Sequence, residues 1–272
     1  MSQVITDSLR RWIVEQAQAG CTPDSVLQAM RASGWEEATA MQAMEECLRA
    51  AVEAPRPVPF VRLLAGCTAD AGDRSVQVLA VMQRPAVVVL GGLLTDEECD
   101  ELVAFAQPRM GRSETVRHDD GTAEVHEART SQGMFFERGE SELIRRLEQR
   151  MATLLNWPVD HGEGLQVLHY QPGAQYKPHH DYFDPAAPGT AAVLKRGGQR
   201  VGTLIAYLNT PSEGGATTFP DVGLEVAPVK GHAVFFSYDR PHPATLSLHG
   251  GAPVTDGHKW VATKWLREGV FT

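Results

Sequence analysis

The chain has 272 residues, of which 43% are hydrophobic and 22% charged, as in an ordinary globular protein of roughly two domains. Its net charge of −9 argues against a general nucleic-acid binder, whose affinity rests on lysine and arginine contacts to phosphate. No apolar run reaches the roughly 20 residues of a membrane helix, no export signal opens the chain, and the four cysteines form no CxxC pair. We therefore expect a cytoplasmic protein without membrane or nucleic-acid partners.

Residues 1–52 are predicted to form a small module of three helices. Each helical stretch is amphipathic, and Thr22 is a typical residue to cap the second one. In the third stretch, Met41, Met44 and Leu48 are the expected apolar stripe. The module loosely resembles a ubiquitin-associated domain, although a helical cap or dimerising appendage is the preferred interpretation. The three stretches cover residues 8–20, 22–34 and 35–51.

Residues 53–85 begin as a proline-rich linker and remain otherwise unassigned. From residue 86 the pattern changes to a buried strand, followed by a helix that Thr95 caps with Glu98 three residues later. A second amphipathic helix and several short β-like runs follow. Helices backing many short strands predict a mainly β fold, a sandwich or barrel, over residues 86–272. The second helix and the β-like runs span residues 141–156, 164–173, 201–211, 232–239 and 258–266.

The sequence "YKPHHDYFD" places two histidines directly before an aspartate. Because successive side chains of a strand point to opposite faces, His179 and Asp181 share one face and His180 points away. An imidazole and a carboxylate so arranged are two corners of the two-histidine, one-carboxylate triad that binds non-haem Fe(II). The third ligand must then come from elsewhere in the chain.

A bare His-x-Asp pattern is weak, since about half an occurrence is expected by chance in this composition. Two similar pairs exist, His118 with Asp120 and His161 with Glu163. Both lie in polar, glycine-containing loops, and we expect them to be solvated loop charges. The 179–181 pair differs because apolar and aromatic residues flank it.

The stretch "LQVLHYQPGAQYKPHHDYFD" resembles the core of the prolyl 4-hydroxylase family of Fe(II)- and 2-oxoglutarate-dependent dioxygenases. The resemblance extends over roughly residues 86–270, through "GGQRVGTLIAYLNTPSEGGATTFPDVGLEVAPVKGHAVFF" and "HGGAPVTDGHKWVATKWLRE". It implies a double-stranded β-helix, or jelly-roll, with supporting helices. The residues that match the family's core pattern are Tyr170, Gly173, Tyr176, His179 and Asp181.

In that family the second histidine ligand precedes a lysine by ten residues. The matching pair in this chain is His249 and Lys259. His232, His242 and His258 are the other histidines nearby, and any lone histidine is more often an ordinary surface or core residue. The resemblance therefore implies His179, Asp181 and His249 as the metal ligands.

A dicarboxylate co-substrate needs a cation at the far end of its pocket. Lys259 and Lys264 lie on opposite faces of one strand, so only one of them can face the metal, and parity alone leaves the choice open. The alternative role for a lysine here is a surface side chain that extends its ammonium group into solvent. The resemblance selects Lys259 for the C5 carboxylate of 2-oxoglutarate, with hydrogen bonds from Tyr170 and Thr217.

The resemblance further implies that Tyr176 and Arg200 line the groove for the substrate, with Trp265 at its border. A packed tyrosine and a surface arginine are the ordinary alternatives. The implied reaction hydroxylates a C–H bond, above all of a prolyl residue in a peptide or protein, and releases succinate and CO2. Its implied cofactors and co-substrates are Fe(II), 2-oxoglutarate, O2 and L-ascorbate.

Three other functions remain open at this point. An oxygenase of the same class could act on a free amino acid, a small metabolite or a nucleobase. A zinc or manganese β-barrel hydrolase or isomerase would need neither Lys259 nor 2-oxoglutarate. A non-catalytic scaffold is expected to lack a ligand, whereas all three ligands and the lysine are present in this chain.

Overall fold

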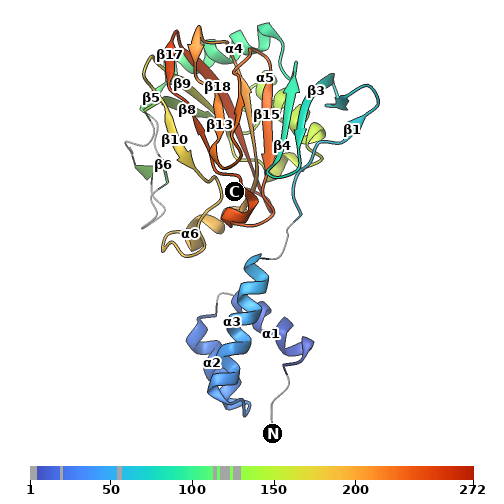
Figure 1. Cartoon of the computed structure of the whole chain (residues 1–272), viewed down its shortest axis with the longest axis vertical. Coiled ribbons are helices and arrows are strands. Elements are labelled where there is room, and N and C mark those ends of the chain that lie inside the picture. The colour runs from blue at the N-terminus through green and yellow to red at the C-terminus, as the bar shows by residue number, and fades with distance from the viewer. Residues whose placement is uncertain (1–4, 19–20, 54–56, 113–114, 117–122, 125–129) are drawn as a thin grey trace. The chain divides into compact units, whose positions relative to one another are not determined.

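The computed structural model describes residues 5–18, 21–53, 57–112, 115–116, 123–124 and 130–272. The chain divides into two compact units, Met1–Pro55 and Arg56–Thr272, each with its own hydrophobic core (Figure 1). None of the helices in the described ranges has both the length and the apolar character needed to cross a lipid bilayer. The pair His118 and Asp120 lies outside the described residues.

The first unit is the predicted three-helix module. Thr22 caps the second helix, since its side chain accepts a hydrogen bond from the backbone N–H of Ser25. The helices pack around a small core of Ile13, Val26, Met30, Ala40, Ala43, Met44 and Cys47. Their bounds are α1 (Asp7–Gln18), α2 (Pro23–Ala32) and α3 (Glu37–Glu53).

The predicted apolar stripe of α3 is wrong at Met41, whose side chain is 56% exposed. The prediction assigns the largest apolar side chains of the helix to its buried face. The helix buries two alanines as well, so its buried face is rotated by about one residue from the predicted one. The side chain of Leu48 lies outside the described residues. The residues that α3 buries are Ala40, Ala43, Met44 and Cys47.

The second unit contains two antiparallel sheets, which confirms the predicted mainly β fold. The larger sheet has the order β1-β2-β3-β4-β15-β11-β18-β9-β8-β5, and the smaller one β10-β16-β13-β14. In the larger sheet the strands are β1 (Leu63–Leu64), β2 (Thr68–Asp70), β3 (Ser75–Met82), β4 (Ala86–Gly91), β5 (Gly111–Arg112), β8 (Gln132–Phe136), β9 (Leu165–Tyr170), β11 (Arg200–Tyr207), β15 (Ala233–Ser237) and β18 (Lys259–Arg267). Those of the smaller sheet are β10 (Tyr176–His179), β13 (Thr217–Phe219), β14 (Leu224–Val226) and β16 (His249–Gly251).

Short elements connect these sheets. Two further strand pairs are β6 (Thr115–Val116) with β7 (Ala123–Glu124), and β12 (Glu213–Gly214) with β17 (Val254–Asp256). Within the stretch that the sequence left unassigned, β1 to β3 extend the larger sheet beyond β4. The helices of this unit are α4 (Asp96–Ala106), α5 (Glu142–Leu154) and α6 (Thr190–Leu194), with 3-10 turns at Gln107–Arg109, Val159–His161, Pro220–Val222 and Pro243–Thr245.

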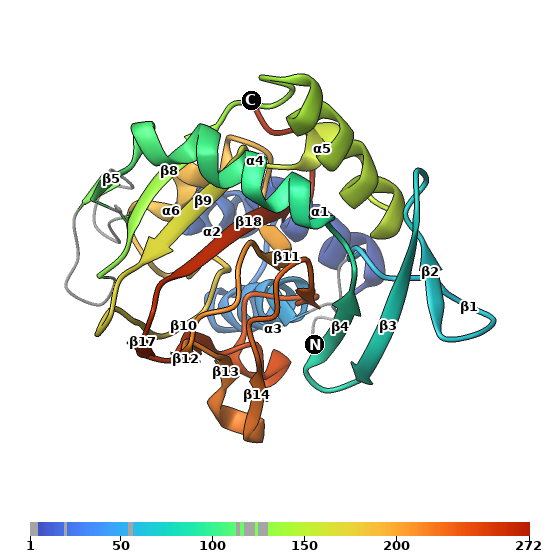
Figure 2. The ribbon, with the colours of Figure 1, turned by 90° about the horizontal axis from the view of Figure 1, so that it is seen from above.

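Alternate residues of the central strands serve two different cores. Helices α4 and α5 cover one face of the larger sheet, and the smaller sheet lies on the opposite side (Figure 2). Leu204 and Ala262 pack in the core under the helices, whereas Tyr207 and Val261 pack in the core between the two sheets. This period of two gives each central strand a structural face and a face toward the space between the sheets.

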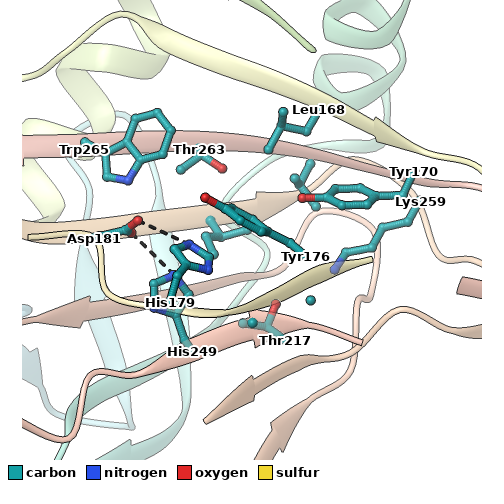
Figure 3. Close-up of a pocket in the computed structure, with 14 residues that line it drawn as sticks. Leu168, Tyr170, Tyr176, His179, Asp181, Thr217, His249, Lys259, Thr263 and Trp265 are labelled. Carbon is teal, nitrogen blue, oxygen red and sulfur yellow. Dashed lines mark ion pairs between the residues drawn. The ribbon is translucent and has the colours of Figure 1, made fainter. Parts of the chain in front are cut away.

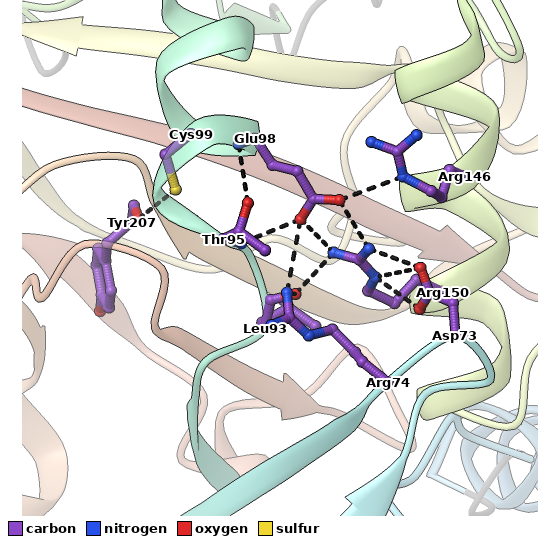
Figure 4. Close-up of polar contacts among 9 residues, drawn as sticks. All are labelled: Asp73, Arg74, Leu93, Thr95, Glu98, Cys99, Arg146, Arg150 and Tyr207. Carbon is purple, nitrogen blue, oxygen red and sulfur yellow. Dashed lines mark hydrogen bonds and ion pairs between the residues drawn. The ribbon is translucent and has the colours of Figure 1, made fainter.

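Buried charges fasten the helices to the sheet. Glu98 completes the predicted capping box with Thr95, and its carboxylate also receives two hydrogen bonds from Arg150 of α5, at 2.6 and 2.8 Å (Figure 4). Arg150 also binds Asp73 in the turn before β3. Burial opposes ionisation of Glu98, but Arg150 outweighs it and lowers the pKa of Glu98 to about 2. The network ties α4, α5 and the β2–β3 turn together.

Candidate metal centre

Three side chains converge in the space between the two sheets. His179 ends β10, Asp181 follows two residues later, and His249 begins β16, where it lies opposite His179 in the strand pairing. Asp181 Oδ1 lies 3.5 Å from His179 Nε2, and Asp181 Oδ2 lies 3.5 Å from His249 Nε2 (Figure 3). One ligand atom from each residue can be chosen so that all three lie within 4.8 Å of one another.

The two-residue spacing brings His179 and Asp181 together, but the reason differs from the one expected. The strand ends at His179, so the chain has already left β10 when it reaches Asp181. His180 is not part of the cluster and stacks on Tyr182, with ring centroids 4.6 Å apart. A bend after the strand therefore sets the orientation of Asp181.

Hydrogen bonds fix which nitrogen of each histidine faces the cluster. His179 Nδ1 lies 2.9 Å from the carbonyl oxygen of Lys177, and His249 Nδ1 lies 3.0 Å from that of Ser247. Because a carbonyl only accepts, each Nδ1 must carry the proton. Both Nε2 atoms then keep the lone pair that a metal ion requires.

The electrostatics suit a cation at this position. Burial lowers the pKa of His249 to about 4, which keeps its imidazole neutral at ordinary pH. Burial opposes the charge of Asp181, yet His249 and His179 hold the pKa of that carboxyl well below its ordinary value. The cluster thus offers the neutral imidazole of His249, the imidazole of His179 and one carboxylate.

This donor set fits Fe(II). Two histidines and one carboxylate on one side of an ion are the facial triad of non-haem iron oxygenases. Donors at right angles around an ion, each about 2.1 Å away, lie roughly 3 Å apart. The two separations of 3.5 Å between the carboxylate and the histidines are close to this value, although each involves a different oxygen of Asp181.

The pocket next to the cluster contains a buried lysine. Lys259 pairs with Tyr170 across β18 and β9, so both side chains face the space between the sheets. Lys259 is 3% exposed, and burial lowers its pKa from 10.5 to about 8. Among the residues that the structure describes, no carboxylate forms an ion pair with it. Thr217 lines the same pocket (Figure 3).

Lys264 occupies the opposite face of the same strand. The alternative of a solvent-exposed lysine is wrong for this residue, which is 2% exposed and bonded to Glu148 of α5 at 2.7 Å. The strand parity is therefore as expected, but both faces of β18 are buried. Only Lys259 faces the metal cluster.

Tyr176 lies in the pocket and Arg200 does not. The Tyr176 ring stacks on the His179 imidazole, with centroids 3.7 Å apart. The Arg200 guanidinium is buried against the Trp265 ring, at 4.1 Å, and binds Glu163 at 2.7 and 2.9 Å. Arg200 therefore does not line the pocket, but its Nη1 donates a hydrogen bond of 3.4 Å to the backbone carbonyl of Asp181.

Glu163 corrects one expectation. The sequence predicted solvated loop charges at His161 and Glu163, but Glu163 is 6% exposed and is shared by Arg200 and Arg267. Nothing in the sequence around Glu163 indicates that an arginine of β11 and another of β18 bind its carboxylate. Glu163 is therefore part of a structural ion cluster, and neither His161 nor Glu163 makes a metal site with other described residues.

Sequence reasoning missed part of the pocket wall. Strand parity, applied forward from Lys259 and backward from Tyr170, identifies Val261, Thr263 and Leu168, because every second residue faces the pocket, whereas Ile205 lies on β11. The rival histidines stay outside the metal cluster, with His258 bonded to His169 and His242 Nδ1 accepting the N–H of Ala244. The additional wall residues are Leu168, Ile205, Val261 and Thr263.

Comparison with known proteins adds an independent line of support. Residues 165–267 match the model of the 2OG-Fe(II) oxygenase superfamily. Probable prolyl 4-hydroxylase 3 of Arabidopsis thaliana is 39% identical over 222 residues, covering 74% of this chain and 75% of the relative. Prolyl 4-hydroxylase 5 of the same plant is 39% identical over 216 residues, covering 72% of each.

One solved structure gives the same result for the fold. The viral collagen prolyl hydroxylase of Paramecium bursaria Chlorella virus-1, described as a complex with 2OG, matches with a TM-score of 0.51 and 30% identity. The match covers 66% of this chain and 95% of the viral one. It confirms the expected jelly-roll.

Proposed function

Because the chain belongs to the prolyl 4-hydroxylase family of Fe(II)- and 2-oxoglutarate-dependent dioxygenases, we propose that it hydroxylates prolyl residues of a peptide or protein. The protein is a 2-oxoglutarate-dependent dioxygenase. When bound, iron would activate O2, which is the oxidant: one oxygen atom would convert C–H to C–OH, and the other would enter succinate as 2-oxoglutarate is oxidised with release of CO2. The chain itself binds and orients the reactants and excludes water.

Each pocket residue has a role in this proposal. His179, Asp181 and His249 would hold Fe(II) through two Nε2 atoms and the carboxylate. The Lys259 ammonium would pair with the far carboxylate of 2-oxoglutarate, with Tyr170 and Thr217 beside it. The single observation that carries the proposal is this buried lysine, which shares a pocket with the three-donor cluster and has no carboxylate partner among the described residues.

A peptide substrate has support from the other end of the pocket. The indole N–H of Trp265 is buried and has no hydrogen-bond partner in the described part of the chain. An unpaired buried donor costs free energy unless a ligand satisfies it, and a peptide carbonyl is a suitable acceptor. Trp265 and Tyr176 would then orient the substrate, while Arg200 would support the indole from behind.

The remaining assignments rest on family resemblance and composition. We infer that ascorbate restores oxidised enzyme, and that the protein works in the cytoplasm, where its four free cysteines would stay reduced. The net charge of −9 gives no reason to expect a nucleic-acid substrate.

We also propose the division into a helical module at 1–52, a segment at 53–85 and an oxygenase domain at 86–272. Contacts alone place the limit of the second unit at Arg56. The helical module would then be an accessory part. A chain that begins at residue 56 should keep turnover if so, and a loss of turnover would assign the module a catalytic role.

The reaction is tested with purified protein, Fe(II), 2-oxoglutarate, O2 and proline-containing peptides. We expect succinate in equal amounts to a hydroxylated proline, identified by mass spectrometry, and neither product from Asp181→Ala. Succinate formed only with a free amino acid would favour the small-molecule oxygenase. Absence of 2-oxoglutarate binding with an intact metal site would favour the zinc or manganese enzyme.

A further inference from the structure

One strand contacts both ends of the site through hydroxyl groups. Strand β11 is paired along its length with β15 on one side and β18 on the other, so its backbone is held in place. Thr203, Ile205 and Tyr207 are spaced by two and therefore share one of its faces. Ile205 lines the pocket, while the other two bind residues at its opposite ends.

At the metal end, Thr203 holds Asp181. Thr203 Oγ1 donates a hydrogen bond of 2.7 Å to Asp181 Oδ2 and lies 2.9 Å from the hydroxyl of Tyr238. A threonine hydroxyl has one proton, and here the carboxylate receives it. Tyr238 must therefore be the donor to Thr203, which gives a directed chain from Tyr238 through Thr203 to Asp181. All three residues are buried.

At the lysine end, Tyr207 holds Thr217. The hydroxyl of Tyr207 donates a hydrogen bond of 2.8 Å to Thr217 Oγ1, and both residues are buried. Because Thr217 accepts this bond, its own proton remains for another acceptor. No described residue accepts that proton, and Thr217 lines the pocket together with Lys259. The arrangement turns Thr217 into a donor toward the pocket.

We propose that Thr203 and Tyr207 of β11, with Tyr238 behind Thr203, are positioning residues for the two ends of the site. Thr203 fixes the carboxylate that holds the metal, and Tyr207 presents the Thr217 proton to the co-substrate carboxylate. The assignment at the lysine end rests on the function proposed above. Since β11 carries both groups, the distance between the metal and the carboxylate-binding donors is set by one rigid strand.

Two matched variants test the proposal, because Tyr238→Phe and Tyr207→Phe each remove one buried phenol hydroxyl and keep the ring. Mn(II) affinity is measured by the paramagnetic resonance signal of the free ion. Affinity of the Mn(II)-loaded protein for 2-oxoglutarate is measured by calorimetry without O2. Tyr238→Phe should weaken Mn(II) binding roughly 3- to 10-fold, and Tyr207→Phe should weaken 2-oxoglutarate binding by the same factor with Mn(II) affinity unchanged.

Thr203 itself gives a stronger test. Thr203→Val should lower Mn(II) affinity about 10- to 100-fold, the usual loss when a group that orients a metal ligand is removed. Thr203→Ser keeps the hydroxyl and should restore affinity to within about threefold of the wild type. If Thr203 contributed packing alone, Thr203→Val should keep more Mn(II) affinity than Thr203→Ser, because Val is closer to Thr in shape. The hydrogen bond predicts the opposite order.

Two outcomes would overturn the inference. One is unchanged Mn(II) and 2-oxoglutarate affinity in both Tyr→Phe variants, and the other is an equal loss of both affinities in each. If Thr203→Val does not fold, the Thr203→Ser and Tyr238→Phe measurements decide the metal end. Failure of the proposed function would look different, since wild-type protein would then bind no 2-oxoglutarate at all.

Discussion

Two lysines five residues apart on β18 face opposite sides of the sheet and meet opposite environments. Lys264 points toward the helices and is bonded to Glu148, which also accepts the N–H of Gly139. Lys259 points into the pocket, where no described carboxylate pairs with it. Both are almost fully buried, so their exposed fractions do not distinguish them. They differ in whether a carboxylate pairs with the ammonium group.

The same contrast holds for the two sides of the sheet. On the helix side, Glu98 and Arg150 neutralise each other, as Glu148 and Lys264 do. On the pocket side, the ammonium of Lys259 lies over the rings of Tyr170 and Tyr207 with no carboxylate partner among the described residues, and the indole N–H of Trp265 has no hydrogen-bond partner there. Paired buried charges stabilise the helix side of the sheet, whereas the unpaired donors that line the pocket are groups that a ligand can satisfy.

The largest effect is expected at the metal cluster. Asp181→Ala removes one of three donors and should abolish Fe(II) binding and turnover, a loss beyond the roughly 100-fold that follows removal of a supporting group. The adjacent variant His180→Ala should keep both, because His180 lies outside the cluster and stacks on Tyr182. Anaerobic titration with Fe(II) measures this difference. Loss of iron in His180→Ala with retention in Asp181→Ala would reassign the ligand.

On the helix side, the expected effect is on stability. Lys264→Met leaves the Glu148 carboxylate buried without its cation and should lower the free energy of unfolding by about 3–5 kcal/mol. The double variant Lys264→Met with Glu148→Gln should recover most of this loss, as denaturant unfolding can measure. If the double variant is no more stable than Lys264→Met, the pairing is not what the lysine contributes.

Much of this contrast could be predicted from residue spacing. A period of two correctly placed Lys259 and Lys264 on opposite faces of β18. It also associated His179 with Asp181, although the strand ends before Asp181 and the bend that follows has no comparable signal. Spacing therefore predicts which face a side chain occupies more reliably than it predicts where an element ends.

Partners distant in sequence could not be predicted. Glu148 and Lys264 are 116 residues apart, and nothing near either residue indicates the other. Glu163 was expected to be solvated because its neighbours are polar and glycine-rich, but Arg200 and Arg267 approach it from two strands. Whether a buried charge is paired depends on the packing of elements, which local sequence does not encode.

On the pocket side, Lys259→Met should affect binding more than folding. It removes a charge-assisted hydrogen bond worth about 1.5–3 kcal/mol and should weaken 2-oxoglutarate binding about 10- to 100-fold. Without ligand, the variant should be at least as stable as the wild type, because no described carboxylate loses its partner. Calorimetry and thermal unfolding of the same samples measure both. Destabilisation as large as in Lys264→Met would remove the distinction between the two lysines.

The smallest expected effect is the dependence of stability on pH that the pocket lysine contributes, which comparison with Lys259→Met isolates. Burial lowers the pKa of Lys259 from 10.5 to about 8, so between these values the unfolded chain binds more protons than the folded one. The ligand-free protein should therefore gain stability as pH rises from about 8 to 10.5, relative to Lys259→Met at each pH. Affinity for 2-oxoglutarate should fall over the same window as the ammonium loses its proton. Identical pH profiles of the two proteins would mean that Lys259 has found a partner, and its role as the carboxylate-binding cation would then be wrong.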